Sequence, residues 1–201
     1  NTSNIYITNG GSEALMFAVM ALCDPGDELM VFEPYYANYN SFARTFNVKI
    51  NAVPTSAEAG YHLPSEEEIE KHITPKTKAI LVSNPGNPTG VVYTEEEMQM
   101  LARLVLKHDM ALIADEVYRE FVYDGDYKSF GTMPELDQNL VIVDSVSKRY
   151  SACGARIGCI ISKNEEFCKQ IMKCCQARLC SPMLEQIGAA GLYTTPTSYL
   201  E

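Results

Sequence analysis

The chain has 201 residues, of which 26 are acidic and 16 basic, and its formal net charge is −10. Its 46% hydrophobic and 21% charged content is typical of a folded globular protein and excludes a disordered one. The acidic balance argues against nucleic-acid binding, because no basic surplus can neutralise phosphates. No apolar run approaches the roughly 18 residues that cross a bilayer. We therefore expect a cytoplasmic protein with neither nucleic acid nor membrane among its partners.

The seven cysteines and the chain ends give two further expectations. No two cysteines have Cys-x-x-Cys spacing, so we expect reduced thiols and no metal site. The alternative is a reactive thiol near Cys174 and Cys175. The chain begins at Asn1 without Met and stops at Glu201. We expect it to be a piece of a longer protein.

Short apolar runs alternate with stretches of helical period along the chain. The apolar runs predict strands over residues 5–8, 28–32, 48–53, 78–83, 110–114, 140–144 and 157–162. Helices are predicted over 12–22, after Ser65, over 95–108 and 164–180, and from Pro182 to about 193. This alternation predicts an α/β domain of three αβα layers around a mainly parallel mixed sheet of about seven strands. Ligands of such sheets bind beyond the carboxyl ends of the strands.

The first strand runs into Thr8-Asn9-Gly10-Gly11-Ser12 and then a helix. Gly10 and Gly11 allow a close approach of the backbone to a ligand, and the helix start with Ser12 offers donors for a phosphate. A Gly-Gly turn with a Ser cap is also a common structural device. The segment has neither the P-loop nor the Gly-x-Gly-x-x-Gly pattern, so nucleotide binding is not expected.

Two further strand ends carry polar residues. Residues 83–90 read Ser-Asn-Pro-Gly-Asn-Pro-Thr-Gly, which predicts a rigid loop able to hold an amide side chain, or a plain turn. Asp115 ends another apolar strand, where an acid is costly to bury unless it meets a cation. The alternative role for Asp115 is that of a helix cap.

The strand over 140–144 leads into the last candidate segment. Lys148 follows Ser145 and Ser147 in an expected loop of small residues, where burial and nearby cations can free its amine for Schiff-base chemistry. Arg156 lies between Gly154 and Gly158 and suits bidentate phosphate binding. Taken alone, either residue is more often a solvated surface cation.

Together these segments resemble the class I/II, fold-type I, pyridoxal-phosphate-dependent aminotransferases, in particular those of aspartate type. The resemblance covers the chain from Gly10 to about Leu192. It rests on Asn-Pro-x-Asn-Pro-Thr-Gly over 84–90, Asp-Glu-x-Tyr over 115–118, and Ser-x-Ser-Lys followed by Gly-x-Arg-x-Gly over 145–158. It implies pyridoxal 5'-phosphate as cofactor, amino-acid and 2-oxo-acid substrates, and a homodimer.

The resemblance also implies the roles of the site residues. Lys148 would form the Schiff base and move the substrate proton, Asp115 would pair with the pyridine nitrogen, and Tyr118 and Asn87 would hydrogen-bond the phenolate oxygen. Tyr36 would stack on the ring. The phosphate would lie among the remaining members of the predicted set, Gly10, Gly11, Ser12, Ser145, Ser147 and Arg156.

The chain departs from the family pattern at two positions and in its extent. Ala155 stands where a Trp is frequent, and Arg149 follows the lysine where a Thr or Ala is frequent. The N-terminal arm and the small domain with the substrate-carboxylate arginine are expected to be absent, so that residues 1–201 form the cofactor-binding large domain. On its own this piece is not expected to be an active aminotransferase. A C–S β-lyase and an aminotransferase-like domain of a transcription regulator remain the alternatives.

Overall fold

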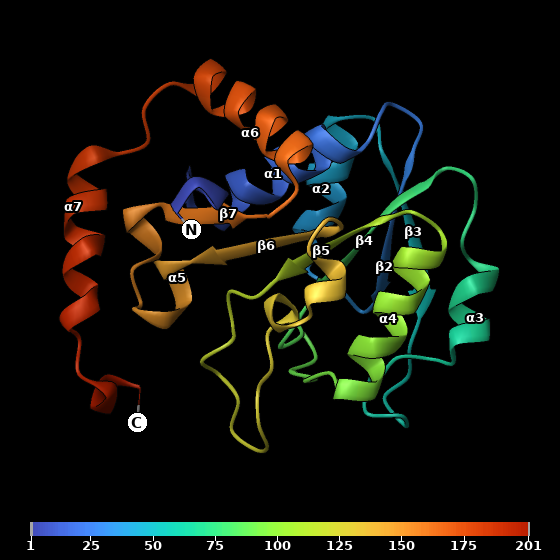
Figure 1. The fold of residues 1–201 in the computed structure, drawn as a ribbon. Helices are drawn as coiled ribbons and strands as arrows, with labels where there is room; N and C mark the ends of the chain where they lie inside the picture. Colours follow the sequence, from blue (N-terminus) through green and yellow to red (C-terminus); the bar gives the residue numbers. More distant parts are fainter. Residues whose placement is uncertain (1, 201) are drawn as a thin grey trace.

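A computed structural model describes residues 2–200 (Figure 1). The strands are β1 Ile5–Asn9, β2 Glu28–Glu33, β3 Lys49–Pro54, β4 Thr77–Ser83, β5 Ala111–Asp115, β6 Leu140–Ser145 and β7 Ile157–Ile161. The α-helices are α1 Gly10–Leu22, α2 Asn38–Thr45, α3 Glu66–Lys71, α4 Glu95–Lys107, α5 Val146–Arg149, α6 Glu165–Arg178 and α7 Met183–Gly191. Short 3-10 turns include η2 Phe130–Thr132, η3 Pro134–Leu136 and η4 Cys153–Ala155.

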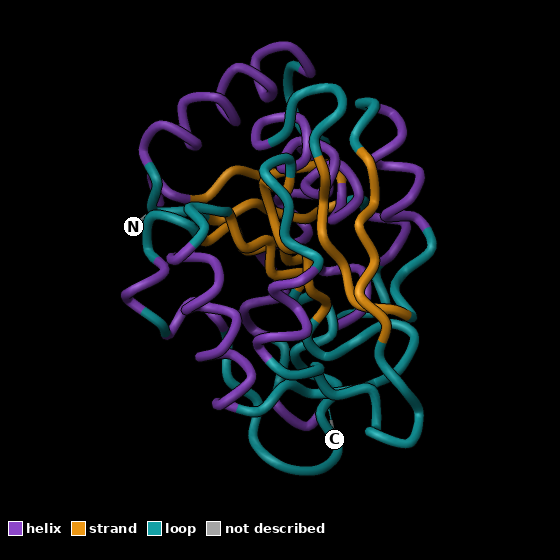
Figure 2. Tube along the Cα trace, turned by 90° about the vertical axis from the view of Figure 1, so that its right-hand side faces the viewer, coloured by secondary structure: helices purple, strands orange, loops and turns teal. Residues whose placement is uncertain are grey.

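All the strands join one seven-stranded sheet in the order β1-β7-β6-β5-β4-β2-β3. Neighbouring strands are parallel except at β7, which runs antiparallel to both β1 and β6. Figure 2 shows the strands enclosed by helices, with long loops gathered at one end of the molecule. The carboxyl ends of β1, β4, β5 and β6 therefore share one edge, which the amino end of β7 joins.

Two hydrophobic cores lie on opposite faces of the sheet. Alternate residues of each strand point to opposite faces, so that Met30 joins one core and Leu29 the other. The first core packs against α3, α4, η2 and η3, and the second packs against α1, α2 and α6. This arrangement confirms the predicted three-layer α/β fold with its mainly parallel mixed sheet.

The helices differ from the sequence expectations in three places. α2 was not predicted, because its sequence Asn-Tyr-Asn-Ser-Phe-Ala-Arg-Thr is poor in strong helix formers; it is stabilised by burial of Tyr39 and Ala43. The segment with Lys148 is the one-turn helix α5 and not a loop, because the Ser145 side chain caps it. α1 begins at Gly10, two residues before the predicted start.

The predicted start of α4 is confirmed in detail. The Thr94 hydroxyl accepts from the Glu97 backbone N–H at 3.2 Å, and the Glu97 carboxylate accepts from the Thr94 N–H at 2.7 Å. These two bonds make the reciprocal capping box that the sequence indicates. At α3 only half of this arrangement forms, because the Glu68 carboxylate pairs with Lys71 at 2.9 Å.

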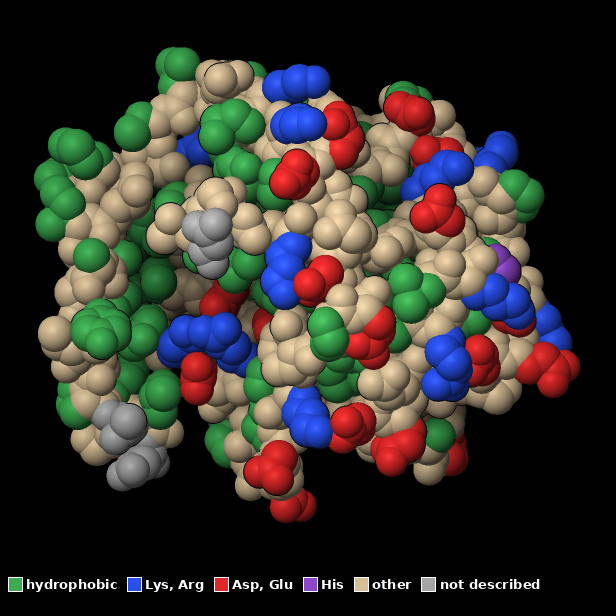
Figure 3. Space-filling view, viewed as in Figure 1, with side chains coloured by type: hydrophobic (Ala, Val, Ile, Leu, Met, Phe, Trp, Pro, Cys, Tyr) green, Lys and Arg blue, Asp and Glu red, His purple; other side chains and the backbone are tan. Residues whose placement is uncertain are grey.

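α7 lies at the margin of the molecule, beside the end of the sheet that contains β7 (Figure 1). None of its described residues is buried, and the side chains of Met183, Leu184 and Ile187 are exposed. Figure 3 shows hydrophobic side chains gathered over this helix. Within residues 2–200, no helix combines the length and apolar character needed to cross a membrane.

Candidate functional site

A cavity of about 190 Å³ lies where the carboxyl ends of β5 and β6 meet the amino end of α1. Apart from Gly10, every residue of the predicted site set lines this cavity. Leu15, Tyr39, Ser83, Val117 and Cys153 line it as well and were not predicted. Residues from five separate segments of the chain therefore converge on one place, at the edge of the sheet where the topology predicts a ligand.

Asp115 ends β5 as a buried carboxylate. Its Oδ2 accepts a hydrogen bond from the Tyr39 hydroxyl at 2.8 Å, and its Oδ1 accepts from the Val117 N–H at 3.4 Å. Burial raises the pKa of Asp115 to about 6, although both hydrogen bonds act in the opposite direction. A buried carboxylate poised in this way suits an interaction with a cationic group of a ligand.

Among the cavity residues that were not predicted, Tyr39 is the one that hydrogen-bonds to Asp115. It is fully buried on the inner face of α2. Its hydroxyl donates to Asp115, which lies 76 positions further along the sequence. Because α2 itself was not predicted, no sequence signal placed this tyrosine beside Asp115 rather than in the core.

Lys148 lies in α5, directly after β6. The Ser145 hydroxyl accepts from the Ser147 N–H at 3.1 Å and donates to the Ile157 carbonyl at 2.9 Å, so it ties the start of α5 to β7. Lys148 Nζ lies 5.7 Å from the centroid of the Tyr118 ring. The helix cap thus fixes the backbone from which the amine reaches toward the cavity.

Arg156 is held in a defined position by its backbone and side-chain contacts. Its φ of 52° is left-handed, and its guanidinium donates to the Cys153 carbonyl at 2.8 Å and to the Asn9 carbonyl at 3.3 Å. A Cβ on Gly10 would lie 2.1 Å from Arg156 Nη2. Gly10 therefore makes room for the guanidinium, while the remaining N–H donors of Arg156 stay available to an anion.

The amino end of α1 faces the same region. The Glu13 carboxylate accepts from the Asn9 N–H at 2.8 Å and from the Asn9 side-chain amide at 3.2 Å. An ideal Cβ on Gly11 would lie 3.7 Å from the Ser145 Cβ, so the helix start and the cap of α5 are adjacent. Helix-start N–H groups, the hydroxyls of Ser12 and Ser147, and Arg156 form a donor set suited to a phosphate.

The loop over 84–90 uses its two asparagines differently. Asn84 is fully buried, accepts from the Tyr93 N–H at 3.0 Å and donates its own N–H to the Asp115 carbonyl at 3.0 Å. Asn87 instead lines the cavity. Asn84 is therefore a structural brace, and Asn87 is the amide that the loop presents.

The segment with Tyr118 is anchored by Glu116. This carboxylate is buried and accepts from the Ser129 hydroxyl at 2.8 Å and from the Phe130 N–H at 3.0 Å. Burial raises the pKa of Glu116. The contacts close the loop between residues 117 and 129 on itself, and this holds Tyr118 at the cavity.

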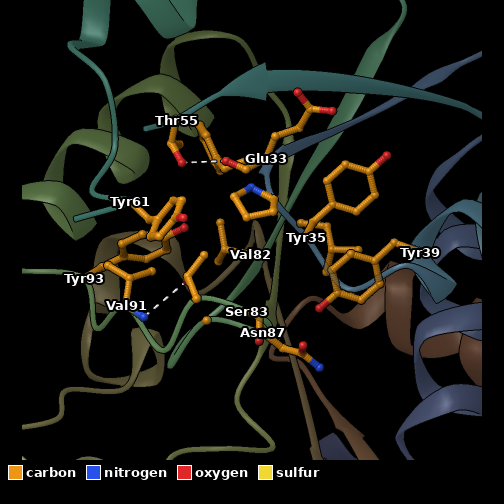
Figure 4. A pocket seen from close by; sticks show the side chains of 15 residues that line it. Glu33, Tyr35, Tyr39, Thr55, Tyr61, Val82, Ser83, Asn87, Val91 and Tyr93 are labelled. Carbon is orange, nitrogen blue, oxygen red and sulfur yellow. Dashed lines mark hydrogen bonds between the residues drawn. The ribbon is translucent and has the colours of Figure 1, made fainter. Parts of the chain in front are cut away.

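The adjacent tyrosines Tyr35 and Tyr36 face different spaces. Tyr36 lines the main cavity and meets the Tyr39 ring edge-on at 5.5 Å between centroids. Tyr35 lines a neighbouring hollow of about 20 Å³, together with Tyr61 and Tyr93 (Figure 4). Figure 4 shows the Tyr39 hydroxyl pointing toward Ser83 and Asn87, and these three residues line both spaces. Of the two neighbours, Tyr36 is the one available to a ligand in the main cavity.

Comparison with known proteins agrees with this arrangement. The family model for aminotransferase class I and II matches residues 1–199. The aspartate/prephenate aminotransferase of Thermus thermophilus is 38% identical over 152 residues, which are 76% of this chain and 39% of that protein. The aspartate aminotransferase of Thermotoga maritima is 38% identical over 161 residues, or 80% of this chain and 42% of that protein.

Solved structures show the same similarity in three dimensions. A crystal structure of Thermotoga maritima aspartate aminotransferase matches with a TM-score of 0.93 and 34% identity, over 100% of this chain and 53% of that one. An alanine aminotransferase from Pyrococcus furiosus matches with a TM-score of 0.91 and 30% identity, over 98% of this chain and 51% of that one. The chain thus spans about half or less of the length of these proteins. On its sequence, fold and cavity, the chain belongs to the class I and II aminotransferase family.

Proposed function

We propose that the protein is a pyridoxal-phosphate-dependent aminotransferase, which transfers an amino group between an amino acid and a 2-oxo acid. Aspartate and glutamate are the favoured amino donors, in keeping with the names of the Thermus and Thermotoga relatives. The observation that carries the proposal is that Lys148, Asp115 and Arg156 line one cavity. An amine, a buried carboxylate and an anchored guanidinium are the groups that an aldehyde, a ring nitrogen and a phosphate require.

The donor set of the cavity fits the cofactor. Arg156, Ser12, Ser147 and the first N–H groups of α1 would bind its phosphate, and Ser145 would hold the start of α5 beside it. Asn87 and Tyr118 would donate hydrogen bonds to its ring oxygen, and the Tyr36 ring would cover its face. Lys148 would bind its aldehyde covalently through Nζ, with release of one water molecule.

Two residues of the chain would control the reacting proton and charge. When bound, the cofactor supplies an electron sink for negative charge on the substrate α-carbon. Lys148 Nζ, once free, would take the proton from the α-carbon and return it at the end of the transfer. Asp115 would keep the ring nitrogen protonated, since a buried carboxylate is stabilised by a cationic partner. The Tyr39 hydrogen bond would orient Asp115 for this contact.

An absorption titration with pyridoxal phosphate tests the proposal. The full-length protein, freed of unbound cofactor, should show a band in the near-ultraviolet or visible range that differs in wavelength from that of the free aldehyde, because an imine with Lys148 is a different chromophore. Lys148→Ala should remove this band and reduce amino-group transfer between aspartate and 2-oxoglutarate to background. A band of unchanged intensity in Lys148→Ala would contradict the assignment of Lys148.

We also propose that the enzyme acts as a homodimer in the cytoplasm and that residues 1–201 form its large, cofactor-binding domain. The exposed apolar side chains of α7 support a subunit contact. The free cysteines support a reducing compartment. The domain assignment is supported by the match to only part of each relative.

A further inference from the structure

Next to the cavity, two arginines and two carboxylates alternate in a closed ring. Asp144 Oδ2 lies 3.0 Å from Arg149 Nη2 and 3.3 Å from Arg119 Nη2. Glu120 Oε1 lies 3.2 Å from Arg149 Nε and 3.6 Å from Arg119 Nε. We call these four residues the arginine–carboxylate ring. Each arginine contacts both carboxylates, an arrangement that the planar, forked guanidinium permits.

The ring joins the two segments that carry the predicted catalytic side chains. Arg149 directly follows Lys148 in α5, and Asp144 directly precedes Ser145, the cap of α5. Arg119 and Glu120 directly follow Tyr118. The backbones of the two segments are joined just before the ring, where the Glu116 N–H donates to the Val143 carbonyl at 2.9 Å. The ring therefore bridges the segment with Lys148 to the segment with Tyr118 through side chains.

The ring is partly shielded from solvent. The side chains of Asp144 and Arg149 are 12% and 14% exposed, whereas those of Arg119 and Glu120 are each 34% exposed. Isolated surface ion pairs contribute little, but a network with shielded members is more strongly coupled. Figure 3 shows acidic and basic side chains meeting in the region of α5.

The ring also sets the local charge. Two positive and two negative side chains cancel, so a ring at neutral pH adds no net charge beside the cavity. Burial is the main cause of the raised pKa of Asp115, and the charges of Asp144 and Glu116 raise it further. Loss of one arginine would leave one negative charge uncancelled, and loss of Asp144 would leave one positive charge uncancelled.

We infer that Arg149 is a positioning residue, which through the arginine–carboxylate ring holds the Lys148 helix against the Tyr118 segment and keeps the charge there balanced. This inference rests on the proposed function of Lys148. It assigns a role to a position where the sequence departs from the frequent Thr or Ala of the family. Arg149 acts through its neighbours and does not line the cavity.

The experiment compares Arg149→Met, Asp144→Asn and a distant control in the full-length protein loaded with pyridoxal phosphate. The control is Arg103→Met, which removes an arginine paired with Glu66 at 2.6 Å between α3 and α4. The first readout is the pH midpoint of the absorption band that depends on Lys148. Arg149→Met should raise this midpoint, because the uncancelled negative charge favours the protonated form. Asp144→Asn should lower it, and Arg103→Met should leave it unchanged.

The second readout separates positioning from general stability. Arg149→Met should lower kcat about tenfold to hundredfold with little change in KM, because a displaced Lys148 loses its reactive geometry. Combining Arg149→Met with Glu120→Gln should lower kcat little more than Arg149→Met alone does, since both substitutions break the same ring. Arg103→Met should change kcat by less than twofold.

The outcomes distinguish the inference from the proposed function. If the parent protein forms no band, or keeps it in Lys148→Ala, the proposed function fails and the inference fails with it. If the parent band behaves as expected but Arg149→Met and Asp144→Asn leave its midpoint unmoved, or move it in the same direction, only the inference is overturned. The same holds if Arg149→Met affects the melting temperature alone.

Discussion

Asp115 is a buried acid whose contacts are incomplete without a ligand. The Tyr39 hydroxyl and the Val117 N–H donate to it, but within residues 2–200 no cationic side chain forms an ion pair with it. Burial has a larger effect than these two hydrogen bonds, and it raises the pKa of Asp115 from 3.8 to about 6. Such a group destabilises the ligand-free protein whenever it is ionised.

Replacement of Asp115 by a neutral residue should therefore stabilise the cofactor-free protein against unfolding. Between pH 3.8 and about 6 the folded protein binds more protons at Asp115 than the unfolded chain does, so stability falls as the pH rises through this window. Asp115→Asn removes this loss and should gain stability on the order of 3 kcal/mol above pH 6, from about 1.4 kcal/mol per pKa unit. Urea unfolding from pH 3.5 to 7.5 measures the difference. A gain that is equal at all pH values would refute the assigned cause.

The site residues show what a single sequence can and cannot reveal. The convergence of Lys148, Asp115, Asn87 and Arg156 on one cavity was predictable, because each lies next to the end of a strand within a recognisable motif. Tyr39 was not, because its partner is set by the packing of α2 against the sheet, which has no local signature. The arginine–carboxylate ring was hidden for the same reason, since its contacts join residues 119–120 to residues 144–149.

At the level of elements, the strands were the most predictable part. Each predicted strand begins and ends within about two residues of the observed one, because buried parallel strands are continuous apolar runs. The short helices α2 and α5 depend on tertiary burial and on a side-chain cap, and neither has enough length for a periodic pattern. The close contact between β7 and α1 likewise appears only in three dimensions.

The close contact between β7 and α1 predicts that one added methyl group, on Gly158, destabilises the protein. A Cβ on Gly158 in β7 would lie 2.5 Å from the Gly10 carbonyl carbon and 2.6 Å from the Gly11 nitrogen, both of which are backbone atoms. Gly158→Ala should therefore displace the start of α1, cost about 3 kcal/mol of stability by overpacking, and weaken phosphate binding. Gly154→Ala, where a Cβ meets nothing within 4 Å, is the matched control. Thermal unfolding and the dissociation constant for pyridoxal phosphate report the two effects, and equal values for both variants would contradict the packing argument.

On the scale of the molecule, exposed apolar side chains gather on α7. Leu184 and Ile187 are 75% and 65% exposed, and Leu179 before the helix is also exposed. Adjacent exposed apolar side chains of this kind mark interaction surfaces in folded proteins. The proposed homodimer would bury this face.

Charge placed on this face should therefore weaken subunit association. Leu184→Glu combined with Ile187→Glu should shift the full-length protein from dimer toward monomer, with a dissociation constant raised at least about tenfold, since two buried apolar side chains are worth more than 1.4 kcal/mol. Leu106→Glu on α4, which is 46% exposed, should leave the assembly unchanged. Sedimentation velocity measures the distribution, and a dimer unaffected by the double variant would place the subunit contact elsewhere.

The reversed direction of β7 has one more consequence. Because β7 begins at the edge where β6 ends, the chain returns from one strand to the next without crossing the sheet. Lys148 and Arg156 thus belong to one short connection, and their separation is limited by only seven intervening residues. The amine and the guanidinium are therefore carried by one short, continuous segment of the chain. An engineer could transplant or redesign it as a unit, whereas Asp115 would have to be supplied by a different strand.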